Sequence, residues 1–412
     1  MSLATGYRCD DCRSTAALDR PALLCRQCGG LLEVEYDLGR APGDLLTRAA
    51  AARELGMWRW HELLPLPAGA RRISLGEGDT PLLSMPGLAA RLRIPGLLVK
   101  NDSLMPTGSF KDRGFALAVS FARQLGIERA FTYSSGNAGA SFAAYAARAG
   151  MAATVLVEES ANDIKTALIR LYGARVLRLR YDSSVEIFAA VSALAGRGHY
   201  SFVNFINPVR HEAMKTYAYE ICAELGRAPD VMVHPVGTGG GLWGAWKGFL
   251  ELRQLGVIDR LPRMVGVQPA ASAPLVRAFL AGETSAAPYG DASRTVAQSI
   301  AGDAPIQGGR RLLRAFRDSG GRAVSVEDAD LFEAMRLLGR ESVAVEPSAA
   351  ASVAALFRAR EEGWVSESDT VVSVVTGAAL KQPVALQQAA PPPAGTVRAD
   401  PDALAEVLGQ PG

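Results

Sequence analysis

The stretch AFTYSSGNAGASFAAYAARAGMAATVLV, residues 130–157, decides the fold class of this chain. It begins with a β-rich run at 130–133, passes through a turn of small residues, and continues into a helical pattern at 138–149. A second apolar run, 153–157, follows that helical pattern directly. A strand, a helix and a second strand in this order form a unit whose strands are parallel and whose helix covers one face of the sheet.

The same alternation extends over most of the chain. Further β-rich runs, each with a helical pattern nearby, lie at residues 97–100, 174–179, 200–204, 231–236, 264–268 and 370–375. Continuous apolar strands that alternate with helices are typical of parallel sheets covered on both faces. The sequence therefore predicts an α/β protein with twisted, mostly parallel sheets.

The composition is that of a globular protein with balanced charge. Of its 412 residues 49% are hydrophobic, and 44 Lys and Arg against 42 Asp and Glu leave a formal net charge of +2. A protein whose main partner is a nucleic acid carries a clearer positive excess. No apolar run reaches the roughly 20 residues that span a bilayer, and the first residues lack the pattern of a signal peptide. We therefore expect a cytoplasmic protein with no membrane partner and no nucleic-acid partner.

Four of the five cysteines form two C-x-x-C pairs, Cys9 with Cys12 and Cys25 with Cys28. Two such turns brought together by a hairpin supply the four thiolates that Zn²⁺ prefers in a tetrahedral site. Structural disulfides and a thioredoxin-like redox pair are the alternatives; a cytosolic location disfavours the first and the lack of a surrounding βαβ unit the second. The spacing predicts a zinc ribbon over residues 1–40 with a structural role.

Three loops of glycine and small residues lie where ligands bind in α/β proteins, beyond the carboxyl ends of strands. Two of them span residues 106–114 and 134–139. The third contains Gly237, Thr238, Gly239, Gly240 and Gly241. Such a loop lets a phosphate approach backbone N–H groups at a helix start, although a tight turn without a ligand has the same composition. The loop fits neither the dinucleotide nor the Walker pattern, so it predicts a phosphate-bearing cofactor that is not a nucleotide.

Lys111 lies in the first turn of a helical pattern, directly after a proline- and glycine-containing loop. Only six residues of the chain are lysine, so few amines are available for covalent chemistry. A positioned amine together with a phosphate-binding loop indicates pyridoxal phosphate (PLP), whose aldehyde the lysine holds as a Schiff base. An ordinary surface lysine is the alternative, but it would have to coexist with all three loops.

The motifs PTGSFKDRG (106–114) and SLGEGDTPL (74–82) resemble those of threonine synthases and their close paralogues among the fold type II PLP enzymes. The resemblance covers about residues 74–383, and an N-terminal four-cysteine ribbon also occurs in that group. It implies a two-lobed PLP catalytic core over residues 41–386. The smaller lobe is expected at roughly 104–210 and the larger lobe in the remainder, followed by a proline-rich linker and a short helix over 387–412.

The resemblance also assigns roles at the cofactor. Lys111 forms the Schiff base, Asn137 hydrogen-bonds the ring hydroxyl, and the loop from Gly237 to Gly241 holds the phosphate. Thr376 faces the pyridine nitrogen. A neutral hydroxyl there leaves the ring nitrogen largely unprotonated, which suits elimination and replacement reactions.

Substrate contacts follow from the same comparison of motifs. Thr107 and Ser135 stand where this family binds the substrate carboxylate. Arg113, Arg210 and Lys215 are candidates for binding a second anionic group of the substrate, with ordinary salt bridges as the alternative for each.

Several residues depart from the threonine synthase pattern. Ala378 stands in the position of a histidine, Met105 in that of an asparagine and Asp102 in that of a glutamate. The phosphate loop reads GTGGG where the family pattern is GNAGN. These changes lie in segments that line the pocket, so the sequence indicates the cofactor more firmly than the substrate.

We expect a PLP-dependent lyase that eliminates or replaces a phosphate-type leaving group on an amino-acid substrate. The leading reaction is that of threonine synthase, in which O-phospho-L-homoserine and water give L-threonine and phosphate. The alternatives are β-replacement on O-phosphoserine or a similar substrate, as in cysteate or diaminopropionate synthases, and serine/threonine dehydration. An inactive cofactor-binding regulator and a nucleic-acid-linked module are disfavoured by the intact Lys111 segment and the near-zero charge. The resemblance suggests a homodimer.

Overall fold

The structure is a computed structural model that describes residues 2–52, 56–161, 163–181, 184–197, 199–203, 206–302 and 304–408. Its largest sheet has six strands in the order β12-β11-β10-β13-β5-β4. These strands are β4 (Leu82–Ser84), β5 (Gly96–Asn101), β10 (Val231–Pro235), β11 (Arg263–Pro269), β12 (Arg322–Val326) and β13 (Thr370–Val375). Neighbouring strands are parallel except β4 and β5, which are antiparallel at one edge.

Helices cover both faces of this sheet because its strands are apolar on both sides. In β10, Val231 and Val233 belong to one apolar core and Met232 to another, as expected when successive side chains point to opposite faces. One core is shared with α8 (Thr216–Leu225), α9 (Gly240–Gln254), α10 (Pro274–Leu280) and α11 (Arg310–Asp318). The other is shared with α2 (Pro86–Leu92), α12 (Asp328–Arg340) and α13 (Pro347–Ala354).

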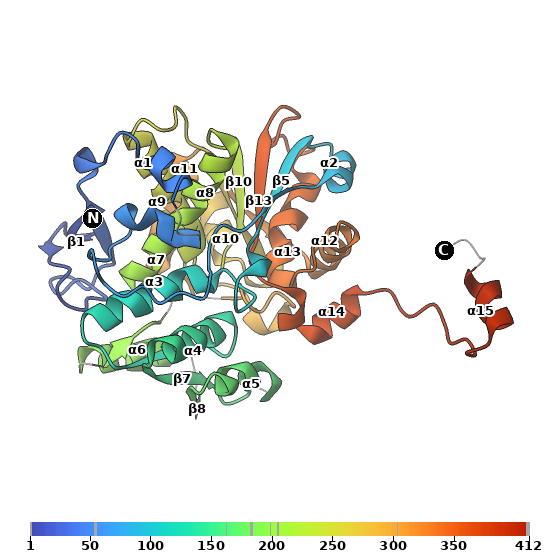
Figure 1. Ribbon diagram of the computed structural model, residues 1–412, viewed down its shortest axis with the longest axis horizontal. Coiled ribbons are helices and arrows are strands. Elements are labelled where there is room, and N and C mark those ends of the chain that lie inside the picture. The colour runs from blue at the N-terminus through green and yellow to red at the C-terminus, as the bar shows by residue number, and fades with distance from the viewer. Residues whose placement is uncertain are drawn as a thin grey trace.

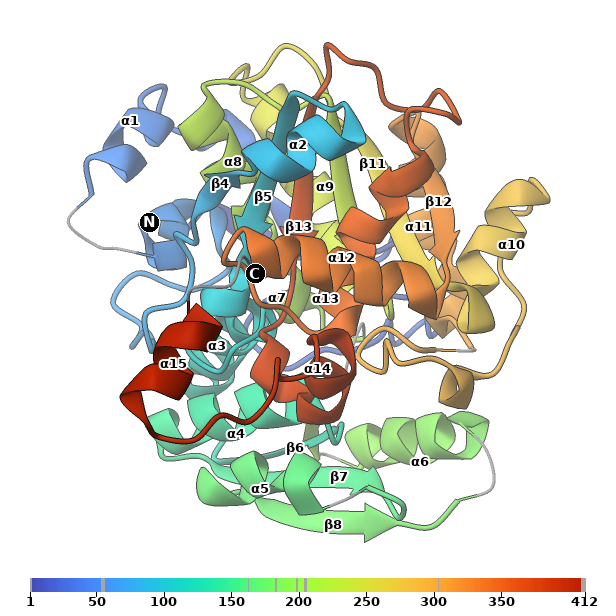
Figure 2. The same ribbon diagram turned by 90° about the vertical axis from the view of Figure 1, so that its right-hand side faces the viewer.

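A second, smaller sheet has four parallel strands in the order β8-β7-β6-β9. Its elements are β6 (Arg129–Tyr133), α4 (Asn137–Ala149), β7 (Ala152–Glu158), α5 (Asp163–Leu171), β8 (Arg175–Leu179), α6 (Ser184–Gly196) and β9 (Tyr200–Ser201). Figures 1 and 2 show this sheet below the larger one, and in Figure 1 α3 (Lys111–Gln124) and α7 (Pro208–Met214) lie between the two. All of the small sheet falls inside the range expected for the smaller lobe.

The predicted α/β class with mostly parallel sheets is confirmed. The helical pattern expected at 138–149 is α4, and the runs at 130–133 and 153–157 are β6 and β7. Two edge strands, β4 and β12, were not anticipated, because edge strands carry mixed polar and apolar residues without a continuous apolar run. Of the run expected at 200–204, residues 200 and 201 form a strand and residues 202 and 203 do not; position 204 lies outside the described residues.

The N-terminal segment forms a three-stranded antiparallel sheet in the order β2-β1-β3. Its strands are β1 (Ala4–Cys9), β2 (Thr15–Ala16) and β3 (Leu32–Tyr36), and α1 (Leu45–Ala50) and the 3-10 segment η2 (Gly56–Leu63) follow. The ammonium of Lys247 in α9 donates to the Val34 carbonyl at 2.5 Å, so this small sheet is attached directly to the larger lobe. Among the described residues, no helix is long and apolar enough to cross a membrane.

The C-terminal tail projects away from the rest of the chain (Figure 1). The helix α14 (Pro383–Ala389) packs against α12 and buries Ala385 and Ala389, so it belongs to the core and spans the boundary expected at 386. The last helix, α15 (Pro401–Leu408), buries none of its residues. Residues 391–408 therefore carry no contact on which the described core depends.

A chain truncated after Ala390 should fold as the full chain does. Because residues 391–408 are almost entirely exposed, we expect the free energy of unfolding to change by no more than about 0.5 kcal/mol, and the melting temperature by less than about 2 °C. Calorimetry of the two chains measures this. A chain that ends near Pro383 is the contrast, because it also removes the packed helix α14 and should melt at a clearly lower temperature.

Candidate active site

Loops from four distant parts of the chain meet at the carboxyl end of the larger sheet. The loop before α3 pairs with the end of β13: the Phe110 amide donates to the Thr376 carbonyl at 3.0 Å, and the Ala378 amide to the Gly108 carbonyl at 2.9 Å. The start of α4 and the glycine loop before α9 complete the group. This is the position at which open α/β sheets bind their ligands.

Lys111 is the first residue of α3 and is partly exposed, with its Nζ 3.9 Å from the centre of the Phe110 ring. Although part of the residue is exposed, the surrounding protein removes most of the water from its ammonium and thereby lowers the pKa to about 7; the nearby Arg210 guanidinium acts in the same direction and Glu346 opposes it. A lysine with such a pKa is a neutral amine in about half of the molecules near pH 7, and the neutral amine is the form that attacks a carbonyl carbon.

Asn137 is the first residue of α4 and points toward a carboxyl group that the sequence analysis missed. Its Nδ2 donates to Glu346 Oε1 at 2.9 Å and to Ser299 Oγ at 3.3 Å. Glu346 directly precedes Pro347 at the start of α13. The signal that could have identified it is a lone carboxylate in an otherwise apolar segment, residues 343–351, which nothing in the segment itself explains.

The glycine loop leads from β10 into α9, where Gly239 caps the helix with a φ of +84°. A Cβ on Gly239 would lie 2.2 Å from Leu312 Cδ1, and one on Gly241 would lie 2.5 Å from His234 Cε1. Packing against protein atoms alone therefore excludes larger residues at both positions. The amides of the first turn of α9, including those of Gly240 and Gly241, have no carbonyl partner within the helix and suit an anion.

The residues of the site fit PLP. Three buried side-chain atoms near Lys111 have no hydrogen-bond partner among the described residues: Ser109 Oγ, His234 Nε2 and Glu346 Oε2. Such orphaned groups are rare in proteins unless a ligand or water meets them. Together with an amine of lowered pKa and the unpaired amides of a helix start, they match an aldehyde that also carries ring heteroatoms and a phosphate.

The two hydroxyls expected to bind a substrate carboxylate have carboxylate partners of their own. Thr107 Oγ1 donates to Asp112 Oδ1 at 2.6 Å, and its amide donates to Asp112 Oδ2 at 2.7 Å. Ser135 Oγ donates to Glu158 Oε1 at 2.6 Å. Both residues lie in loops of the site, but their hydroxyl protons are engaged. A substrate carboxylate would therefore be received by amides at the start of α4 or by a reoriented hydroxyl.

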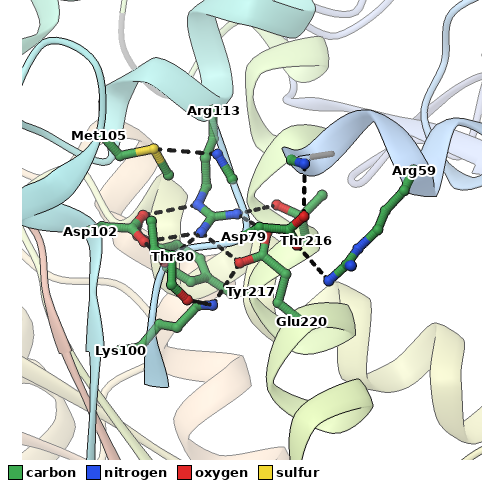
Figure 3. Close-up of polar contacts among 12 residues, drawn as sticks. Arg59, Asp79, Thr80, Lys100, Asp102, Met105, Arg113, Thr216, Tyr217 and Glu220 are labelled. Atoms are coloured by element: carbon green, nitrogen blue, oxygen red, sulfur yellow. Dashed lines mark hydrogen bonds and ion pairs between the residues drawn. The ribbon is translucent and has the colours of Figure 1, made fainter. Parts of the chain in front are cut away.

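Arg113 lies in a buried ion-pair network and not at the site (Figure 3). Its guanidinium, with no exposed surface, donates to Asp102 Oδ2 at 2.9 Å and Oδ1 at 3.0 Å and to both carboxylate oxygens of Glu220. It also donates hydrogen bonds to the hydroxyl oxygens of Thr216 and Thr80. This corrects the expectation that Arg113 receives a substrate anion, because every face of the guanidinium already has a protein partner.

The Lys215 ammonium is also paired with carboxylates of the protein. Its buried Nζ lies 3.0 Å from Glu212 Oε2 and 2.9 Å from Glu251 Oε1, and 3.6 Å from the centre of the Tyr36 ring. These contacts also argue against a substrate role. Arg113 and Lys215 therefore form ordinary salt bridges, which was the alternative that the sequence left open for each.

Arg210 differs from the other two cations. Its NH1 donates to the Phe202 carbonyl at 2.6 Å, its guanidinium lies 4.1 Å from the centre of the Phe115 ring, and no carboxylate pairs with it among the described residues. Burial lowers the pKa of this arginine to about 9, and its charge acts on Lys111. Of the three candidate cations, Arg210 alone has no counter-ion within the described part of the chain, and its charge acts on the Lys111 amine.

The four N-terminal cysteines converge. The Sγ atoms of Cys9, Cys12, Cys25 and Cys28 all lie within 4.8 Å of one another, and none forms a disulfide. Cys9 is paired with Cys28 at 3.4 Å and Cys12 with Cys25 at 3.6 Å. Four thiolates at this spacing form a cage for a single tetrahedral metal ion.

Comparison with known proteins agrees with this geometry. The family described as pyridoxal-phosphate dependent enzymes matches residues 73–377. The threonine synthase of Methanocaldococcus jannaschii is 37% identical over 406 residues, 97% of this chain and 98% of that protein. The threonine synthase of Mycobacterium bovis is 39% identical over 355 residues, 85% and 94% of the two chains. The crystal structure of the T.th. threonine deaminase has a TM-score of 0.60 at 27% identity and covers 73% of this chain and 92% of that one.

Replacing Arg113 by methionine should destabilise the protein strongly, because Asp102 and part of the Glu220 carboxylate would stay buried without a counter-ion. We expect the free energy of unfolding to fall by about 3–5 kcal/mol at pH 7. Denaturant unfolding measures it, with Arg336→Met as control; Arg336 forms an exposed pair with Glu333 worth less than about 1 kcal/mol. Equal effects of the two substitutions would contradict the structural role of Arg113.

The stability that Arg113→Met loses should depend on pH. Burial would raise the pKa of Glu220, but Arg113 and Lys100 outweigh it and hold that pKa at about 2. A carboxylate whose pKa is lower in the folded than in the unfolded state contributes stability above its unfolded value, about 4.3, and loses it as the pH falls toward 2. The stability difference between the parent chain and Arg113→Met should therefore narrow below about pH 4.3.

Proposed function

Because the chain belongs to the family of pyridoxal-phosphate dependent enzymes, we propose that it catalyses the threonine synthase reaction. In this reaction O-phospho-L-homoserine and water give L-threonine and phosphate. The observation that carries the proposal is 37% identity to a threonine synthase over 97% of this chain, since so complete a match includes both lobes, the site and the four cysteines' segment.

The residues of the site support this chemistry. Bound PLP supplies an electron-withdrawing ring that stabilises negative charge at the α carbon of an amino acid. Lys111 holds the cofactor through its Nζ and, once the substrate's amine has released it, accepts and returns protons at the substrate carbons. A pKa of about 7 suits both directions of transfer, because general acid–base groups work best with a pKa near the working pH.

The remaining roles at the cofactor are proposals of the same kind. Asn137 would meet the ring hydroxyl, Thr376 the ring nitrogen, and the loop of Gly237, Thr238, Gly239, Gly240 and Gly241 the phosphate. Arg210 is our candidate for attracting the substrate's anionic group, because its positive charge has no counter-ion among the described residues. Release of phosphate breaks the carbon–oxygen bond at the substrate's γ carbon, and water supplies the hydroxyl at the β carbon.

A second candidate function follows from the residue at position 378. Ala378 replaces the histidine of the threonine synthase pattern, and its amide is bonded to Gly108, three residues before Lys111. Loss of a side chain that contacts a substrate phosphate would cost about 1–3 kcal/mol of binding if its partner stayed unpaired. The protein could then prefer β-replacement on O-phosphoserine or a dehydratase reaction.

The deciding experiment offers purified protein O-phosphohomoserine and O-phosphoserine in parallel. We expect phosphate release from the first, with threonine as the product identified by mass spectrometry. Lys111→Arg is the matched control: it keeps the positive charge but has no free primary amine, so it should lose the visible absorbance of bound cofactor and all phosphate release. Turnover of O-phosphoserine alone, or of neither compound, would overturn the proposed reaction.

We also propose that the four cysteines hold zinc. Zinc is the metal that four thiolates in a closed tetrahedral cage select, although iron accepts the same ligands. Elemental analysis of the purified protein should find about one zinc ion per chain, and a Cys12→Ser, Cys28→Ser double variant should lose it. Iron at this stoichiometry, or a parent chain without bound metal, would refute the assignment.

A further inference from the structure

Glu346 is a buried carboxyl group beside the proposed cofactor site that the reaction as described does not use. It is 1% exposed and lies at the N-cap position of α13. Its amide donates to the Gly377 carbonyl at 3.0 Å, which fixes it to the end of β13. Its Oε1 accepts the 2.9 Å hydrogen bond from Asn137, and its Oε2 has no hydrogen-bond partner among the described residues.

The carboxyl group does not stabilise its own helix. It makes no capping hydrogen bond to its own helix, although it occupies the capping position. No ion pair joins it to a basic side chain in the described part of the chain, although Lys111 and Lys381 act on it through their charges. A buried carboxyl oxygen without a partner costs stability, so a purely structural residue at this position would be better replaced by an apolar one.

Its surroundings connect it to the cofactor-facing residues. The groups facing it are Asn137 from α4, Ser299 from the loop before α11, Lys111 from α3 and Lys381 from η8 (Ala379–Lys381). A Cβ on Gly377 would lie 2.8 Å from Oε1, so the carboxyl group is packed against the backbone of the strand end and has little freedom to turn.

We propose that Glu346 is a positioning residue that fixes the side-chain amide of Asn137 for contact with the bound cofactor. One N–H of Asn137 is held on the immobile carboxyl group, so the amide cannot rotate about its terminal bond. The other N–H, which contacts Ser299 in this structure at a longer 3.3 Å, is the one left for the ring hydroxyl. This inference rests on the proposed PLP site but not on which substrate is used.

The test measures the dissociation constant of PLP, from the absorbance of bound cofactor as the holoenzyme is dialysed against falling PLP concentrations. Glu346→Ala should raise that constant by about 10- to 100-fold, the size expected for losing a hydrogen bond with a charged group. Glu346→Gln keeps an oxygen acceptor in the same place and should restore binding to within about threefold of the parent chain. Glu361→Gln, at an exposed glutamate, is the matched control and should change nothing.

A double-mutant cycle separates positioning from a general loss of structure. If Glu346 acts through Asn137, the variant Glu346→Ala, Asn137→Ala should bind PLP no more weakly than Asn137→Ala alone. Effects that add in full would overturn the proposal, as would unchanged PLP binding in Glu346→Ala. If Glu346→Ala does not fold, the near-isosteric Glu346→Gln provides the test. The proposal would be overturned if Glu346→Gln bound PLP as weakly as Asn137→Ala does.

These outcomes are independent of the proposed reaction. Failure to release phosphate from O-phosphohomoserine would refute the reaction and leave the cofactor measurements interpretable. Normal phosphate release with an unaffected PLP constant in Glu346→Ala would refute the positioning role alone.

Discussion

The buried pairing of Arg113 with Asp102 and Glu220 is the constraint on which the arrangement of this protein depends. It joins the segment directly after β5 and the start of α3, whose paired residues are 11 positions apart, to the middle of α8, which is 107 positions further along the chain. The Lys100 ammonium is a second buried cation, 2.7 Å from Glu220, so the two buried cations balance the two buried carboxylates (Figure 3). Because a buried charge without a partner is strongly destabilising, packing that keeps these charges paired is strongly favoured.

The packing of these elements determines where the amine of Lys111 lies. Lys111 is two residues before Arg113 on α3, so an anchor on the guanidinium also orients the first turn of the helix. On the other side of the same turn, Phe110 and Gly108 are bonded to the end of β13. The amine is therefore held between two rigid attachments, in surroundings whose burial and neighbouring Arg210 lower its pKa. Arg113 of the structural ion-pair network and Lys111 of the candidate site therefore lie within one turn of the same helix.

The four-cysteine segment is joined to the same region through α11. Arg311 pairs with Asp10, beside the cysteines, and its guanidinium lies 5.4 Å from the centre of the Trp243 ring in the first turn of α9. The next residue, Leu312, packs against Gly239 of the glycine loop. The N-terminal sheet is thus not a loose appendage, and one helix contacts both the cysteine segment and the loop proposed to hold phosphate.

The sequence by itself determined the fold class, the lysine proposed to hold the cofactor and the cluster of four cysteines. Each of these is recorded locally: in alternating apolar runs, in a lysine at a helix start after a glycine-containing loop, and in two C-x-x-C turns. It could not distinguish Arg113 and Lys215 from Arg210, since all three are cations in matching motifs and only long-range neighbours reveal which have counter-ions. It also missed Glu346, which is 209 positions from Asn137. Burial and pairing are properties of packed elements from distant parts of the chain, so only the tertiary structure decided which charged groups remain available for chemistry.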